Sequence, residues 1–222
     1  ISIVGPTGCG KTTLINDIEL FAYENTPSKR KILINGESRP KEIMSNPSEN
    51  PIALISQHTN FLSDLPVKKF LEIHARIRQT QNNREIIFET LEFANKLTGE
   101  PIIEHSAMTE LSGGQTRALL IADSVVIGNS PIILLDEIEN AGIHRTKALE
   151  MLKQYNKIFI FVTHDPRIAL LSDFRITMKN GAMQQIIKTG NEEQQVSDKL
   201  RKIDDILLDF RNRIRTGEKL TT

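Results

Sequence analysis

A glycine-rich run near the start of the sequence carries its most specific chemical pattern. In Gly5-Pro-Thr-Gly-Cys-Gly-Lys11-Thr12, two glycines frame four residues and are followed by lysine and threonine. Backbone N–H groups can wrap closely around phosphate oxygens in such a run because glycines lack an obstructing Cβ atom. The lysine places a point charge on the β- and γ-phosphates, and the threonine hydroxyl ligates magnesium. The sequence therefore predicts a phosphate-binding loop at Gly5, Pro6, Thr7, Gly8, Cys9, Gly10, Lys11, Thr12 and Thr13.

The alternative for this run is a glycine-rich turn with a solvated lysine. A β-branched strand pattern precedes the run at residues 1–4, and Leu14, Ile15 and Ile18 follow it at helical spacing. These flanks favour the phosphate loop, because the helix would present its positive N-terminus to the bound anion. Phosphate loops serve kinases, GTPases and motors alike, so the loop alone does not choose a reaction.

A pair of acidic residues narrows the choice. Asp136 and Glu137 follow the apolar run at residues 132–135, which is typical of a buried central strand. Ligands of open α/β sheets bind at the carboxyl ends of the strands. There Asp136 can hold the magnesium shell, directly or through a water, and Glu137 can polarise an attacking water. The alternative, two exposed acids after a core strand, does not account for the loop.

A third motif, Leu111-Ser-Gly-Gly-Gln115, stands before a predicted helix. Its hydroxyl, its free N–H groups and the helix dipole together make a second anion site. A plain Ser-Gly-Gly linker would be the alternative if this motif stood alone. In this sequence it is the second phosphate-binding surface of one domain.

These motifs, in this order, resemble the ATP-binding-cassette (ABC) ATPases, in the form of the nucleotide-binding domain of ABC transporters. The resemblance covers essentially the whole ordered length, and residues 111–115 match the family's signature sequence. It implies ATP and Mg²⁺ as ligands, and attack of water on the γ-phosphate with Lys11 and Glu137 as catalytic residues. It also implies a head-to-tail dimer in which each ATP lies between the loop of one subunit and the signature of the other. The signature residues acting in trans would be Ser112, Gly113, Gly114 and Gln115.

Two further positions match the family pattern, each at the end of a predicted strand. Gln57 stands where the family has a lid glutamine that reaches magnesium and the attacking water. His164, in Val162-Thr-His-Asp165, matches the switch histidine that contacts the γ-phosphate. The resemblance thus places both residues among the catalytic and ATP-binding groups. The expected magnesium ligands are Thr12, Gln57 and Asp136.

The sequence departs from the family pattern in three places. The family stacks adenine on an aromatic residue upstream of the loop, and the sequence begins at Ile1, so that residue and the early antiparallel strands are expected to be missing. Residues 138–144 replace the proline and the Ser-Ala-Leu-Asp turn that the family has after the acidic pair. In the family this turn communicates across the dimer, so the replacement bears on the coupling between its two ATP sites. Residues 121–125 read Ile-Ala-Asp-Ser-Val where an arginine-containing pattern is common.

Strand and helix patterns alternate along the chain and would position these motifs. This alternation predicts an α/β fold: a P-loop NTPase core with a mostly parallel sheet flanked by helices, plus a helical signature subdomain. We expect a nucleotide-binding domain at residues 1–190, with the helical subdomain inserted at about 60–128. Residues 191–222 would form a polar linker and an amphipathic helix. The predicted strands are residues 1–4, 31–36, 51–56, 132–135, 157–162, 174–178 and 183–187, with Asn-Gly turns after the second and between the last two.

The last helix has an apolar seam. Its residues step by four and three positions, which is a heptad pattern: Val196, Leu200, Ile203, Leu207, Phe210 and Ile214. The stretch is short for an unaided coiled coil. We therefore expect the seam to dock on the chain's own domain.

Composition limits the remaining choices. Lys plus Arg and Asp plus Glu both total 28, which favours no polyanionic partner. One cysteine excludes an internal disulfide, and no apolar run could span a bilayer. We expect a cytoplasmic ATPase on the inner face of the membrane, with a second ABC domain and a membrane permease as partners. A soluble ABC ATPase acting on nucleic acid or ribosomes is the alternative, and a small-molecule kinase would leave the signature unexplained.

Overall fold

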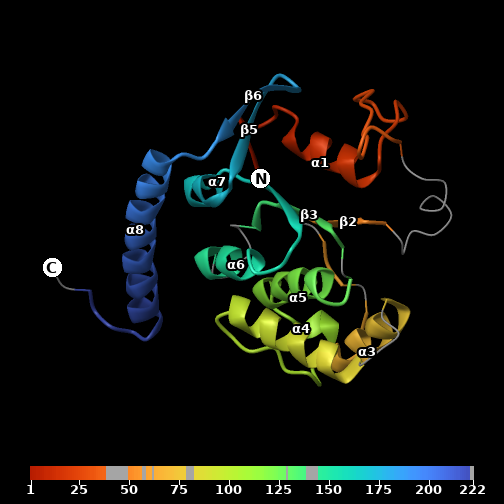
Figure 1. The fold of residues 1–222 in the computed structure, drawn as a ribbon. Coiled ribbons are helices and arrows are strands. Elements are labelled where there is room, and N and C mark those ends of the chain that lie inside the picture. The colour runs from red at the N-terminus through yellow and green to blue at the C-terminus, as the bar shows by residue number, and fades with distance from the viewer. Residues whose placement is uncertain are drawn as a thin grey trace.

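The computed structural model describes residues 1–38, 50–56, 59–61, 63–78, 83–128, 130–138 and 145–220. Its centre is a six-stranded sheet in the order β2-β3-β4-β1-β5-β6 (Figure 1). All pairings are parallel except that of β5 with β6, which is antiparallel. The mostly parallel sheet predicted from the sequence is therefore confirmed. The strands are β1 (Ser2–Val4), β2 (Ile52–Ile55), β3 (Ile132–Asp136), β4 (Ile158–Val162), β5 (Phe174–Lys179) and β6 (Ala182–Lys188).

Helices cover both faces of the sheet, as a parallel sheet requires. Successive strand side chains point to opposite faces, so Leu134 joins Ile15 of α1 in one core while Ile133 and Leu135 join the other. That second core includes residues of α3, α4, α5 and α6. Figure 1 shows α1 on one side of β2 and β3 and these helices on the other. The helices before the tail are α1 (Lys11–Glu19), α3 (Val67–Arg78), α4 (Asn83–Leu97), the short 3-10 helix η2 (Met108–Glu110), α5 (Gly113–Val125), α6 (Arg145–Leu152) and α7 (Pro166–Leu171).

Three neighbouring strands of the sheet end at the same edge. β4 lies between β3 and β1, and Val162 is in register with both Asp136 and Ile3. The segments that follow these strands are therefore adjacent. They are the phosphate loop after β1, Glu137 after β3 and the His164 segment after β4.

Two Asn-Gly turns were predicted, and their surroundings differ. Asn180 and Gly181 have φ values of 51° and 78° and join β5 to β6. Asn35 and Gly36 have φ values of 53° and 84°, the positive pair that such turns need. The strand predicted at residues 31–36 is wrong, however, because in the described residues it makes only isolated bridges. One isolated bridge lies at Lys31 and the other at Ile34, so residues 32 and 33 between them belong to no continuous β-ladder that would hold the segment extended.

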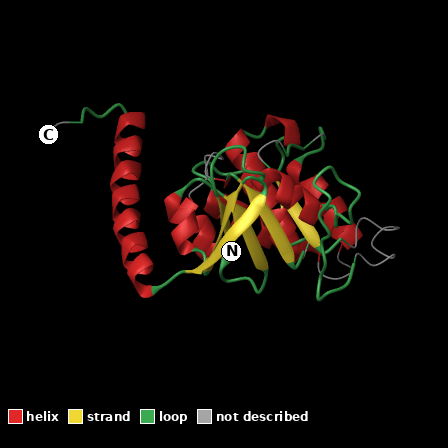
Figure 2. Ribbon diagram, turned by 90° about the horizontal axis from the view of Figure 1, so that it is seen from above, coloured by secondary structure: helices red, strands yellow, loops and turns green. Residues whose placement is uncertain are grey.

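The last helix, α8 (Asn191–Arg215), does not bury its apolar seam. Figure 2 shows it standing at one side of the rest of the chain. Its contacts with the domain are mostly polar: Ser197 is buried, Asp204 pairs with Arg167 of α7, and Arg201 pairs with Glu150 of α6. The predicted docking of the seam is therefore wrong, because these polar contacts turn a different side of the helix toward the domain. No helix among the described residues is long and apolar enough to cross a membrane.

Candidate functional site

The phosphate loop is held tightly at its first glycine. A Cβ atom built on Gly5 would lie 2.4 Å from the carbonyl oxygen of Met178 in β5 and 2.8 Å from the Sγ of Cys9. At the other end, Gly10 has a φ of 95° and caps α1, a conformation that glycine adopts without steric cost. The glycines thus allow the chain to turn sharply between β1 and α1.

Lys11 lies inside the loop. Its Nζ donates hydrogen bonds to the carbonyl oxygens of Gly5 (2.9 Å) and Pro6 (3.1 Å), and the residue is only 6% exposed. A buried cation is costly unless its protons are bonded, and the loop supplies these bonds. Thr12 and Thr13, in the first turn of α1, are exposed. The ammonium and the helix N-terminus therefore concentrate positive potential at the loop.

The β5–β6 turn braces the loop from outside. The N–H of Gly181 donates to the carbonyl oxygen of Cys9 at 2.9 Å, and the Nη2 of Arg30 donates to the carbonyl oxygen of Gly181 at 2.7 Å. Arg30 also pairs with the buried Asp17 of α1 at 2.7 Å. Sequence reasoning missed Arg30 and Asp17, because their contacts join segments far apart in the sequence.

The charge of Asp17 is stabilised by its neighbours. Burial alone would raise the pKa of this carboxyl group, but hydrogen bonds from Ser28 and Arg30 outweigh burial and lower the pKa below its ordinary value. The carboxylate therefore stays ionised in the fold and keeps Arg30 in place beside the turn.

The acidic pair and the histidine come together at the edge where β3 and β4 end. Asp136 is the last residue of β3 and is 9% exposed. The Oε1 of Glu137 lies 3.7 Å from the Nε2 of His164, and both side chains remain accessible, at 30% and 46% exposure. Water can therefore reach the Glu137 carboxylate, as a general base requires. A cavity of about 420 Å³ lies against Gly5 and His164.

The backbone of Glu137 has an unusual conformation that fixes its direction. Its φ is 49°, in the left-handed region that non-glycine residues rarely occupy. Its N–H donates to the carbonyl oxygen of Val162 in β4 at 2.9 Å. Such strain costs about 1–3 kcal/mol and clusters at functional sites.

The segment after His164 is anchored to two helices. The Asp165 side chain caps α7 by accepting a hydrogen bond from the N–H of Arg167 at 2.9 Å. The guanidinium of Arg167 binds both Asp165 and Asp204 of α8. This chain of charges connects the histidine segment to the last helix, and no short-range sequence signal indicated it.

The signature residues cap α5. The Ser112 Oγ accepts a hydrogen bond from the N–H of Gln115 (3.3 Å), and the Gln115 Oε1 accepts one from the N–H of Ser112 (3.0 Å). The Gln115 Nε2 also donates to the carbonyl oxygen of Pro101 at 3.0 Å. Ser112 and Gly113 are exposed, and α5 lies on the sheet face opposite α1. The structure thus gathers the loop, Asp136, Glu137 and His164, and presents the signature separately.

Two sequence predictions lie outside the described residues. Gln57 immediately follows the described segment that ends at Ser56, where the Ser56 N–H is bonded to the Thr59 hydroxyl at 3.0 Å. Most of the unusual turn at 138–144 lies outside too; only Ile138 is described, and it is buried.

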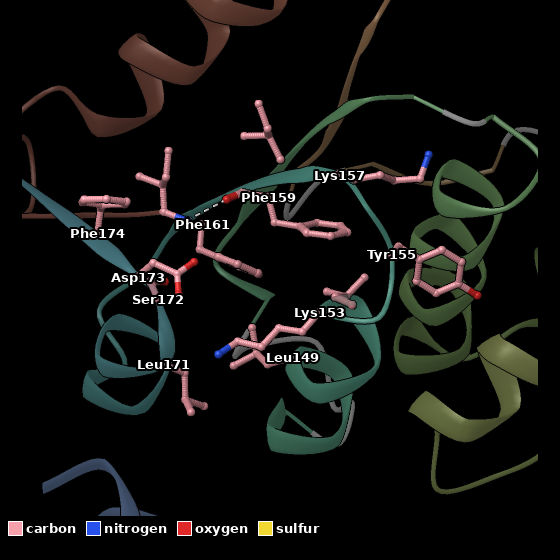
Figure 3. A pocket seen from close by; sticks show the side chains of 13 residues that line it. Leu149, Lys153, Tyr155, Lys157, Phe159, Phe161, Leu171, Ser172, Asp173 and Phe174 are labelled. Carbon is pink, nitrogen blue, oxygen red and sulfur yellow. Dashed lines mark hydrogen bonds between the residues drawn. The ribbon is translucent and has the colours of Figure 1, made fainter. Parts of the chain in front are cut away.

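A second cavity lies at the far end of the sheet. Its volume is about 340 Å³. Figure 3 shows residues that line it, among them Phe159, Phe161 and Phe174. Phe174 begins β5, and Phe159 stands next to the start of β4, so the cavity is remote from the strand ends that carry Asp136 and His164. None of its lining residues belongs to the candidate site.

Comparison with known proteins agrees with this geometry. The family model described as ABC transporter matches residues 1–140, which include the loop, the signature and the acidic pair. The chain belongs to the ABC transporter family. As an ABC ATPase it binds and hydrolyses ATP.

Several known proteins and solved structures are similar to this ABC ATPase over most of its length. It is 50% identical, over its whole length and 84% of the relative, to the uncharacterized ABC transporter ATP-binding protein MJ0121 of Methanocaldococcus jannaschii. It is 33% identical to the spermidine/putrescine import ATP-binding protein PotA of Bacteroides thetaiotaomicron, over 84% of the chain and 40% of PotA. A dimeric, post-hydrolysis structure of the ATP-binding cassette MJ0796 bound to ADP and Pi matches with a TM-score of 0.68 and 25% identity, covering 86% of the chain and 85% of that cassette.

Proposed function

We propose that this ABC ATPase powers a membrane transporter and that each of its ATP sites is completed by a second cassette. The observation that supports the proposal most is that the helix after the phosphate loop and the helix after the signature pack on opposite faces of the sheet. The loop and Glu137 lie at the edge of the sheet where β1 and β3 end, and the loop leads into α1. The exposed Ser112 begins α5, which packs on the sheet face opposite α1. Relatives named as ATP-binding proteins of transporters, and a cassette solved as a dimer, support this reading.

The residues of the site suit Mg²⁺ bound with the nucleotide. The Thr12 hydroxyl and the Asp136 carboxylate are hard oxygen ligands of the kind that Mg²⁺ prefers. We therefore assign the Mg²⁺ ion to a site formed by Thr12, Asp136 and Gln57. When bound there, the ion would supply positive charge that offsets the negative charge developing on the phosphate oxygens during transfer.

The protein's own groups account for the rest of the reaction. Glu137 orients and deprotonates the water that attacks the γ-phosphorus in line, and His164 contacts the γ-phosphate. The bond from the γ-phosphorus to the bridging oxygen breaks, and ADP leaves with that oxygen. Lys11 and the N–H groups of Gly113 and Gly114 from the second cassette stabilise the transferring phosphoryl group.

ATP would act as a switch between two states of the pair. Only the closed dimer supplies both the loop and the signature to one triphosphate, so ATP binds the closed state more tightly. Hydrolysis removes that advantage and lets the dimer open. A permease attached to the cassettes would receive this motion.

Glu137→Gln tests the catalytic assignment. The amide keeps the size of the side chain but cannot accept the proton, so we expect turnover to fall by about 10²–10⁴-fold. ATP should still bind and should convert the variant to a stable dimer in sedimentation velocity. The control is Glu72→Gln in the surface of α3, which should behave like wild type. Unimpaired hydrolysis in Glu137→Gln would refute the general-base role.

The transport role is tested separately by purification from native membranes. The expected result is a stoichiometric complex with a polytopic membrane protein whose ATPase activity disappears with Glu137→Gln. A chain that stays wholly in the soluble fraction and binds RNA or DNA in a salt-dependent way would instead support the nucleic-acid alternative.

A further inference from the structure

Helix α8 presents an apolar face that no described part of the chain covers. It is a face of five side chains, each between 41% and 60% exposed: Val196, Ile203, Leu207, Phe210 and Ile214. At a rise of 1.5 Å per residue, the face is about 27 Å long. Exposed apolar surface of this extent on one side of a helix indicates an interaction site.

The side of α8 that contacts its own domain is a different one. Ser197 is buried and Asp204 binds Arg167, while the partly buried Leu200 lies between this side and the apolar face. With about 100° between successive residues, the centre of this set lies roughly a quarter turn from the apolar face. The helix can therefore stay attached to its domain while the apolar face contacts another molecule.

The charges of α8 decide what kind of molecule that is. Helices that lie on membranes carry Lys and Arg on their polar face, which anionic lipids attract. Between Asn191 and Arg215 there are six acidic and six basic residues, so this helix has no net charge. A balanced, mixed set of charges around an apolar seam is typical of helices that pair with helices.

We propose that the apolar face of α8 pairs in parallel with α8 of a second copy of this chain. In heptad terms, Leu200, Leu207 and Ile214 occupy the a positions, and the d positions are taken by Val196, Ile203 and Phe210. In a parallel pair each residue meets its own counterpart, so every layer from 196 to 214 is apolar. The seam needs no other sequence to complete it.

Charge and shape both favour the parallel arrangement. A g residue of one helix lies beside the following e residue of the other, which sets Lys199 beside Asp204 of the partner subunit, twice by symmetry. The Asp204 carboxylate would then face two cations, Lys199 across the pair and Arg167 of its own domain. Antiparallel pairing would set Lys199 against Arg213 of the partner subunit, which is repulsive. Ser197 and Asp204, which face the domain, are e positions. The two e flanks lie on opposite sides of a parallel pair, so the two domains stay apart.

This contact differs from the ATP-dependent dimer, because it uses no residue of the nucleotide site. The seam spans fewer than three heptads, so the pairing is weak and reversible. It would hold two cassettes near each other in the absence of nucleotide.

Cysteine cross-linking tests the arrangement directly. Ile203→Cys should form a disulfide-linked dimer under mild oxidation without nucleotide, and Asp205→Cys, on the outer side of the same turn, should not. Cys9 is buried and present in both variants. Equal linking of the two variants, or linking only when Val196→Cys is mixed with Ile214→Cys, would overturn the parallel pair.

Sedimentation equilibrium without nucleotide tests the association itself. The wild type should show reversible dimerisation that Leu207→Glu abolishes, while Asp198→Asn leaves it unchanged. Leu207→Glu combined with Glu137→Gln should still dimerise on adding ATP, which shows that the variant is folded. A wild type that stays monomeric at every concentration would overturn the proposal. So would binding to phosphatidylglycerol vesicles that depends on Leu207.

Discussion

Gly5→Ala would place a methyl group 2.4 Å from the carbonyl oxygen of Met178 and 2.8 Å from the Sγ of Cys9. Both separations are well inside van der Waals contact. The first clash is with backbone of β5, which cannot swing aside as a flexible side chain would. The loop must therefore move away from β5, and the bonds between the β5–β6 turn and the loop must stretch.

The cost can be bounded from the geometry. Overpacking of this kind destabilises a protein by about 1–3 kcal/mol. In a chain of this size each kcal/mol lowers Tm by about 2–4 °C. ATP binding should weaken as well, because the displaced carbonyl oxygens of Gly5 and Pro6 hold the ammonium of Lys11.

Two measurements separate these effects: Tm by calorimetry and the Kd for ATP by titration. Gly36→Ala is a matched control, since Gly36 also has a positive φ of 84° but no atom within 4 Å of the added Cβ. It should lose some stability from backbone strain and keep its affinity for ATP. Unchanged Tm and ATP affinity in Gly5→Ala would refute the tight contact between the loop and β5.

Three other substitutions probe the surroundings of the site. His164→Ala should lower kcat strongly with little change in Tm, because the side chain is nearly half exposed; an unchanged kcat would exclude its catalytic role. The lowered pKa of Asp17 means that its stabilisation is present above about pH 4 and is lost as pH falls through the folded-state pKa. Asp17→Asn should therefore cost about 1–3 kcal/mol in urea unfolding at pH 7, with a difference that shrinks below pH 4, and a constant difference would contradict this. His74→Ala removes the 2.7 Å bond to the buried Asp123 and should cost about 1–3 kcal/mol, whereas Lys69→Ala on the same helix should cost almost nothing; equal Tm values would show that the pair is dispensable.

The strands and helices that carry the site were predictable because their signals are local. The apolar run before Asp136 gave β3, and helical spacing after the loop gave α1. The helix predicted after residues 111–115 begins inside that motif, at Gly113, because the side chain of Ser112 caps it.

What the sequence did not indicate depends on tertiary contacts. The bond between Arg30 and Gly181 joins residues 151 positions apart. Glu137, which has a positive φ, donates its N–H to Val162 in the neighbouring strand β4. The apolar seam of α8 was also only partly predictable. Its heptad period is visible in the sequence, but the side of α8 that faces the domain is set by tertiary ion pairs such as that of Arg167 with Asp204. The strand predicted at residues 31–36 had the right composition but lacked a continuous partner.

The central claim is that each ATP site is built from two chains, and mixing two inactive variants tests it most directly. Lys11→Ala disables the loop. Ser112→Asp keeps a side chain that caps helices well but sets a negative charge against the phosphates of the partner's ATP. Each variant alone should hydrolyse ATP very slowly. When they are mixed before ATP is added, half of the random dimers contain one intact site, so activity should recover to about a quarter of wild type if the sites act independently. A mixture no more active than its two components would contradict a site shared between chains.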